Sequence, residues 1–169
     1  SIFKKDKIAF WPSYNTEEAK KILRNEGFCN GKILNLPLTY RSNVPTDKLI
    51  ALSWQKDVNA SMDDCLSIEI NGLESTTIYK NLSEGIYSAV ILDWKGAYSD
   101  PEAYLKPLLS CKEFKGAICF KGESVYSGSF WASQEVENLF KESESLNGIE
   151  RLNKLIKIEK IASESIPYI

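Results

Sequence analysis

The sequence predicts an α+β fold: a mixed, mainly antiparallel sheet with three to four helices packed on it. Three observations lead to this prediction. The length of 169 residues suits one domain, and 43% hydrophobic with 26% charged residues is ordinary globular composition. Strand-helix-strand passages surround a middle that is rich in β-forming residues. No repeat, low-complexity tract or linker-like stretch interrupts the chain, so we expect a single globular domain spanning 1–169.

The first part of the chain predicts a strand, a helix and a second strand. Residues 7–11 form an apolar run that is typical of a strand. Asn15 followed by Glu18 matches a capping box, so a helix should begin there, and Gly27 suits its left-handed end. The residues expected on the buried face of this helix are Ala19, Ile22 and Leu23. Residues 32–38 predict the second strand.

The middle of the chain predicts an antiparallel sheet. Short alternating or β-rich runs indicate strands at 49–54, 65–70 and 76–79. Asn71-Gly72 is a strong hairpin signal between the last two of these runs. Residues 86–94 are the most apolar run, which predicts a central strand because buried strands lose the polar alternation.

The last part predicts two capped helices with a hairpin between them, and then a final helix. Asp100-Pro101 should begin a helix whose inward residues are Tyr104, Leu105, Leu108 and Leu109. Residues 114–120 and 124–131 predict the hairpin. Ser133 should cap a third helix, whose expected buried residues are Val136, Leu139 and Phe140. From Ile149 onward the apolar spacing favours a helix over a strand.

Charge and hydropathy exclude several classes of function. The 21 Lys and Arg residues nearly balance 23 Asp and Glu residues, so no broad basic surface is available and no nucleic acid partner is expected. Apolar runs are too short to span a bilayer, and the first residues do not resemble a signal peptide. These features predict a cytoplasmic location with no membrane partner.

The cysteines strengthen that expectation. Cys29, Cys65, Cys111 and Cys119 form no close pair in sequence and lie mostly beside apolar residues, which predicts four free, buried thiols. The chain contains no histidine, so a zinc site would need distant thiols to gather. We therefore expect no metal and no cofactor.

The motifs argue against most enzymes. Without histidine, Ser-His-Asp and Cys-His catalysis cannot operate, and no glycine-rich nucleotide-binding loop is present. One pattern has the shape of an enzyme site: in a strand, Asp93 and Lys95 of Asp93-Trp94-Lys95 would share a face. It resembles the strand end of PD-(D/E)xK nucleases, which implies a Mg²⁺-dependent nuclease with Asp64 or Glu69 as the upstream carboxylate. The alternative is a strand-end charge pair facing water.

Acidic and aromatic residues favour a non-catalytic protein-binding protein instead. Glu135, Glu142 and Glu144 should project from the third predicted helix, with Trp131 and Tyr126 on the hairpin before it. Such groups can occupy a cationic active site and steer association. The character is similar to that of bacterial immunity proteins, which implies an inhibitor that occludes the active site of a toxin.

A third interpretation is a small-molecule binding module. Its pocket would be lined by the tryptophans, which lie near predicted strand ends with tyrosines such as Tyr98 close in sequence. The tryptophans are Trp11, Trp54, Trp94 and Trp131.

Overall fold

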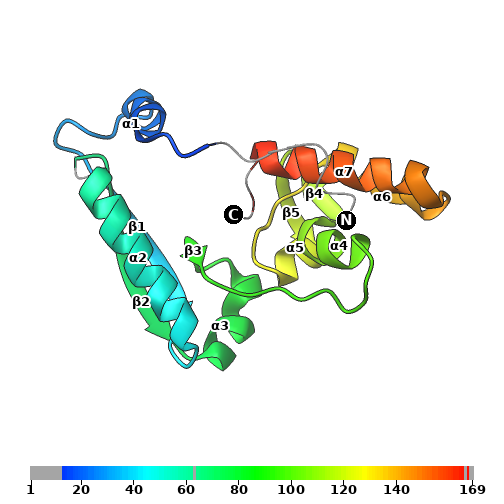
Figure 1. Cartoon of the computed structure of the whole chain (residues 1–169), viewed down its shortest axis with the longest axis horizontal. Coiled ribbons are helices and arrows are strands. Elements are labelled where there is room, and N and C mark those ends of the chain that lie inside the picture. The colour runs from blue at the N-terminus through cyan, green and yellow to red at the C-terminus, as the bar shows by residue number, and fades with distance from the viewer. Residues whose placement is uncertain (1–12, 63, 166, 168–169) are drawn as a thin grey trace. The chain divides into compact units, whose positions relative to one another are not determined.

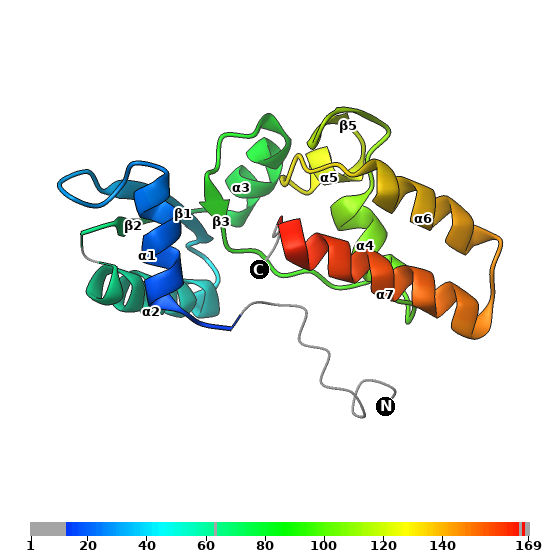
Figure 2. The ribbon, with the colours of Figure 1, turned by 90° about the horizontal axis from the view of Figure 1, so that it is seen from above.

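The structure is a computed structural model that describes residues 13–62, 64–165 and 167 (Figures 1 and 2). Its chain divides into two compact units. The first unit is Tyr14–Asp93, and the second contains the described residues from Trp94 onward. The strand predicted at 7–11 lies outside the described residues, and the single domain spanning 1–169 stays a prediction.

The first unit begins with α1 (Thr16–Asn25). The side chain of Asn15 accepts a hydrogen bond from the backbone N of Glu18 at 3.0 Å, which confirms the predicted cap. Two of the three expected buried residues, Ala19 and Leu23, pack against a buried cluster of Cys29, Met62 and Cys65. Ile22 is 55% exposed, so its predicted burial is wrong.

A parallel three-stranded sheet forms the centre of the first unit. The middle strand β1 (Leu34–Arg41) pairs with β2 (Leu66–Leu73) and with β3 (Ala89–Val90), both in parallel. Parallel neighbours need long crossovers. The connections are α2 (Pro45–Ser61) between β1 and β2, then α3 (Ser75–Asn81) and the 3₁₀ helix η2 (Leu82–Glu84) between β2 and β3. Figure 1 shows α2 running along β1 and β2.

Two segments predicted as strands are helical, so the prediction of a mainly antiparallel sheet is wrong. Residues 49–54 lie inside α2, which begins at Pro45, a residue favoured at the first helical position. Residues 76–79 lie inside α3. Gly72 lies in β2 instead of a hairpin turn, opposite Tyr40 of β1. A Cβ on Gly72 would lie 2.7 Å from the Tyr40 hydroxyl, so the tyrosine ring covers the glycine.

In the second unit, three helices surround one apolar cluster. They are α4 (Glu102–Leu109), α6 (Gln134–Glu144) and α7 (Gly148–Ser165). The buried residues of the cluster are Leu109, Val136, Leu139, Phe140, Leu155, Ile158 and Ala162. Ser133 caps α6 by accepting a hydrogen bond from the backbone N of Val136 at 3.4 Å. The predicted third and final helices are confirmed, whereas Tyr104 of α4 is half exposed and not inward as predicted.

A short hairpin lies between α4 and α6. Its strands β4 (Glu113–Lys115) and β5 (Ile118–Lys121) are antiparallel, with Gly116 at φ 61° in the turn. The predicted strand 114–120 is therefore two strands. Its predicted partner, 124–131, overlaps the short helix α5 (Glu123–Tyr126) and makes one isolated bridge, from Trp131 to Ile118.

The α+β class is thus confirmed, while the sheet is mostly parallel and helices α1 to α7 exceed the three to four expected. None of the described helices has the length and apolar character to cross a membrane.

The four cysteines form two disulfides, Cys29–Cys65 and Cys111–Cys119, with Cα–Cα distances of 4.1 and 5.9 Å. The prediction of free thiols is wrong, although their predicted burial is correct. Sequence spacing does not show which cysteines meet in space, and an apolar neighbourhood suits a buried disulfide as well as a buried thiol. Disulfides persist in oxidising compartments, which removes the support that the cysteines gave to a cytoplasmic location.

Candidate functional site

The candidate site is a pocket of about 460 Å³ in the second unit, called the 94–123 pocket below. Its lining comes from the irregular segment 94–98, from α4, and from residues that flank the β4–β5 hairpin. Two lining residues are aromatic, five are charged and four are small. They are Trp94 and Tyr98; Lys95, Glu102, Lys106, Lys112 and Glu123; and Ala97, Ala103, Pro107 and Ser110.

Packing of Tyr104 holds the segment that carries the two aromatic residues. A Cβ on Gly96 would lie 2.6 Å from Cε2 of Tyr104, so the tyrosine ring lies directly on the backbone of this segment. Trp94 and Tyr98, on either side of Gly96, are 47% and 61% exposed. The segment therefore presents two aromatic side chains to solvent from a packed backbone.

An ion-pair network holds the start of α4. Arg151 of α7 donates to both carboxylate oxygens of Asp100, at 2.8 and 3.0 Å, and to Glu102 at 2.6 Å. Lys106 donates to Glu102 at 3.0 Å and to Glu144 at 2.9 Å. The hydrogen bond from Arg151 lowers the pKa of Asp100, and the bond to Glu144 raises the pKa of Lys106. Two charged residues of the pocket, Glu102 and Lys106, are thus already paired within the chain.

The other three charged residues of the pocket are Lys95, Lys112 and Glu123. All three are exposed, and none forms an ion pair with another residue of the described ranges. The pocket therefore combines aromatic faces with charged groups that a ligand can reach.

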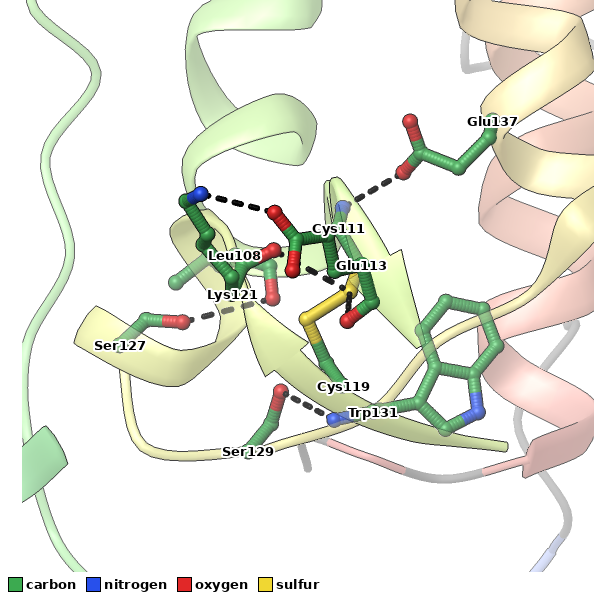
Figure 3. The surroundings of a disulfide bond; sticks show 9 residues. All are labelled: Leu108, Cys111, Glu113, Cys119, Lys121, Ser127, Ser129, Trp131 and Glu137. Carbon is green, nitrogen blue, oxygen red and sulfur yellow. Dashed lines mark hydrogen bonds and ion pairs between the residues drawn. A yellow bond between two sulfur atoms is a disulfide. The ribbon is translucent and has the colours of Figure 1, made fainter. Parts of the chain in front are cut away.

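Ser110 and Lys112, which form one wall of the pocket, stand on either side of Cys111 in sequence. Cys111 is held by its disulfide to Cys119 (Figure 3). The backbone N of Cys111 donates to the carboxylate of Glu137 from α6 at 2.6 Å. Burial raises the pKa of Glu137. Gly122 packs against the backbone of Cys111. A Cβ on Gly122 would lie 2.7 Å from Cα of Cys111, so only glycine fits there.

A second pocket, about 510 Å³, lies along the ends of α6 and α7. It is lined by Glu142, Ser145, Leu146, Glu150, Asn153 and Lys154. This pocket is more open than the 94–123 pocket and has no aromatic residue in its lining, so it offers less apolar area to a ligand.

Asp93, predicted for the nuclease alternative, belongs to a structural ion-pair network. It pairs with Arg41, a buried residue whose Nε also donates to Asp47 at 2.6 Å and whose Nη1 donates to the Tyr79 hydroxyl at 3.1 Å. The bond to Asp47 does most to raise the pKa of Arg41. Since β3 ends at Val90, Asp93 does not lie on a strand, and the alternation that placed it beside Lys95 does not apply.

The other nuclease residues are not gathered into a metal site. Glu69 is exposed in β2, Asp64 lies just before that strand, and Lys95 lines the 94–123 pocket of the second unit. Over the described ranges, no group of three or more acidic or cysteine side chains could hold a metal ion.

The acidic residues predicted to bind a partner pair with the chain's own lysines. The pairs are Glu135 with Lys157 and Glu142 with Lys154, each at 2.6 Å, and Glu144 with Lys106 at 2.9 Å. Trp131 is partly buried against the apolar cluster of the second unit, and Tyr126 is exposed on α5. Neither lines the 94–123 pocket. Partner binding by these five residues stays a prediction, and the relatives described next contradict the toxin for which it was made.

Comparison with known proteins gives a family match. Residues 2–116 match the model of the bacterial extracellular solute-binding proteins, family 5 Middle. The chain is also similar to Di/tripeptide-binding protein 4 of Pseudomonas aeruginosa (strain UCBPP-PA14), with 25% identity over 167 residues. That match covers 96% of this chain and 28% of the relative, so the chain spans less than a third of the relative's length.

Solved structures show the same fold. The murein tripeptide binding protein MppA of Escherichia coli has a TM-score of 0.73 at 17% identity, covering 96% of this chain and 31% of that one. OppA of Haemophilus influenzae in complex with RPPGFSPFR has 0.75 at 19%, covering 88% and 27%. A dipeptide binding protein from Pseudoalteromonas sp. SM9913 in complex with Met-Leu has 0.74 at 20%, covering 94% and 30%.

These findings correct four predictions. An immunity-type inhibitor and a nuclease are both wrong, because the matched family binds solutes. A toxin as the partner is wrong for the same reason, and the similar proteins named above are peptide-binding. The cytoplasmic location is wrong, because the family is extracellular. A match over residues 2–116 spans most of the sequence, and the chain therefore belongs to the bacterial extracellular solute-binding proteins of family 5.

Proposed function

We propose that this chain contributes a short-peptide-binding surface to an extracellular solute-binding protein, and that the 94–123 pocket is part of this surface. One observation carries the proposal. The match to the family model runs through every lining residue of the pocket except Glu123. The di/tripeptide-binding relative, at 25% identity, supports a short peptide as the solute.

The chemistry of the pocket suits such a ligand. A short peptide carries an ammonium group, a carboxylate and side chains of mixed polarity. The pocket offers two aromatic faces, lysines and glutamates within about 460 Å³, which lies in the range of roughly 300–1,000 Å³ of small-molecule sites. Tryptophan and tyrosine are enriched among the residues that dominate binding energy once a partner covers them. Trp94 is therefore the residue whose loss should weaken binding most.

Isothermal titration calorimetry with dialanine, trialanine and Met-Leu tests the proposal. We expect the purified protein to bind at least one of these peptides, and Trp94→Ala to weaken that binding about tenfold or more. Trp54→Ala is the matched control, because Trp54 is similarly exposed, at 40%, but lies on α2 and does not line the pocket. It should bind as the parent does.

Two results would contradict the proposal. If none of the peptides releases or absorbs heat and none raises the melting temperature, the chain does not bind short peptides. If peptides bind but Trp94→Ala leaves the dissociation constant unchanged, the binding surface lies outside the 94–123 pocket.

A further inference from the structure

We infer that the 94–123 pocket selects a carboxylate of the bound peptide, and that Lys95 and Lys112 are the residues that recognise it. The inference rests on the proposed function and adds a ligand preference to it. A carboxylate can come from an acidic side chain or from the peptide's C-terminus, and both present the same two oxygens to a lysine.

Three lysines line the pocket, and among the described residues only Lys106 forms ion pairs with carboxylates of the chain. Lys106 is held between Glu102 and Glu144, at 3.0 and 2.9 Å. A ligand carboxylate would have to displace one of these glutamates to bind it. Because its positive charge is already matched, Lys106 helps to position α4 and is not available to the ligand.

Lys95 and Lys112, in contrast, are available to a ligand. Both line the pocket with exposed side chains, and the described part of the chain supplies no carboxylate to either of them. They come from separate parts of its wall, the segment 94–98 and the residue after Cys111. Each ammonium group donates up to three hydrogen bonds, and bonds to a carboxylate are among the strongest that lysine makes.

Whether the pocket prefers acidic or basic peptides depends on the charges of its lining that have no partner among the described residues. Glu123 is the one carboxylate of the lining for which the described residues provide no cation. Two lysines against one glutamate leave a positive surplus, which a ligand carboxylate neutralises and a ligand ammonium or guanidinium group increases. The pocket should therefore favour acidic peptides and reject basic ones.

The aromatic residues strengthen this selection. Trp94 and Tyr98 flank Lys95 in sequence and line the same pocket. When a peptide covers their faces, water leaves the pocket, and the attraction between unlike charges increases because the local dielectric constant falls.

Four tripeptides distinguish the two sources of the carboxylate. They are Ala-Glu-Ala and Ala-Gln-Ala, each with a free C-terminus and as the C-terminal amide. Selection of an acidic side chain predicts tighter binding of both Glu peptides than of the matched Gln peptides. Selection of the C-terminus predicts tighter binding of both free acids than of the amides. In either case we expect a difference of about tenfold in the dissociation constant, falling with added salt.

Variants in which one lysine is replaced by glutamine test whether Lys95 and Lys112 cause the carboxylate preference, because each variant removes one positive charge. Lys95→Gln and Lys112→Gln should each reduce the ratio of dissociation constants between the favoured and disfavoured peptides. Lys115→Gln is the control, because Lys115 is exposed on β4, loses the same charge and does not line the pocket. It should leave the ratio unchanged. Circular dichroism of each variant checks that it is folded.

The outcomes separate this inference from the proposed function. If the peptides bind but all four bind equally, or if Lys115→Gln lowers the ratio as much as Lys112→Gln, the carboxylate preference of the pocket is wrong while peptide binding stands. If none of the four binds although dialanine, trialanine or Met-Leu does, the carboxylate preference is wrong while peptide binding stands. If no peptide of either set binds, the proposed function is wrong and the inference fails with it.

Discussion

Removal of the Cys29–Cys65 disulfide should reduce the free energy of unfolding more than removal of Cys111–Cys119. The two bonds join residues separated by 36 and 8 positions in sequence. A cross-link restricts the unfolded chain more when it closes a longer loop, and the loop-entropy relation gives about 3.8 and about 2.5 kcal/mol. All four cysteines are at most 2% exposed, so their replacement by alanine removes similar amounts of buried surface in both pairs.

Urea unfolding of two double variants measures the difference. Cys29→Ala with Cys65→Ala should lose about 1.3 kcal/mol more stability than Cys111→Ala with Cys119→Ala. Circular dichroism and tryptophan fluorescence should be followed together, because they show whether the two units unfold in one transition. The parent in excess reductant serves as the control and should be less stable than either variant. If the short-loop variant loses as much stability as the long-loop variant, loop entropy does not govern these disulfides.

Three further predictions concern single residues. Asp47→Ala should lower the free energy of unfolding by roughly 3–5 kcal/mol, because it leaves buried Arg41 without its main partner. Asp93→Ala should lower it by about 1 kcal/mol or less, because the Asp93 side chain is 56% exposed whereas that of Asp47 is 5% exposed. Gly122→Ala should cost roughly 3 kcal/mol or more, because its backbone is at φ 147° and a Cβ would collide with neighbouring backbone atoms. Asp100→Asn should make the free energy of unfolding fall less steeply as the pH is lowered. The folded pKa of Asp100 is lowered, so its contribution is present above its ordinary pKa of 3.8 and is lost as the pH falls through the folded pKa.

Chemical denaturation checks the first two predictions, and repeating it between about pH 6 and pH 2 checks the third. Equal losses for Asp47→Ala and Asp93→Ala would show that burial does not rank these ion pairs. For Gly122→Ala the control is Gly116→Ala, where φ is 61° but an added Cβ would meet no described residue within 4 Å apart from its chain neighbours, so about 1 kcal/mol is expected. Similar costs at both glycines would refute the collision. If the free energy of unfolding falls equally steeply with decreasing pH in the parent and in Asp100→Asn, the assigned ion pair is refuted.

Local signals predicted helices α1, α4, α6 and α7, but not α2, α3 or α5. Asn15 and Ser133 cap α1 and α6 through hydrogen bonds that span three residues, so nearby sequence contains all that is needed to recognise them. The parallel sheet was not predictable in this way. Whether 49–54 forms a strand or part of a helix depends on whether β1 pairs with β2 or with this segment, and a short apolar run suits both.

The candidate site shows the same limit. Trp94 and Lys95 were both predicted at a strand end, because the apolar run 86–94 does not show that pairing stops at Val90. Trp94 was also among the tryptophans expected to line a pocket, and it does line the 94–123 pocket. Lys112 and Glu123 had no signal of their own. They join the pocket only because Cys111 meets Cys119 and because Gly122 allows two backbone segments to approach closely. Neither contact can be read from spacing along the chain.

The wall that contains Lys112 is constrained twice, by a covalent bond at Cys111 and by close backbone contact at Gly122. Such a wall is preorganised: its backbone has little conformational freedom to lose when a ligand arrives, so binding there costs little ordering entropy. The opposite holds for Trp94 and Tyr98, whose exposed side chains still have rotamers to lose. Adaptation to ligands of different size should therefore occur at the two aromatic side chains, while the position of Lys112 stays constant from one ligand to the next.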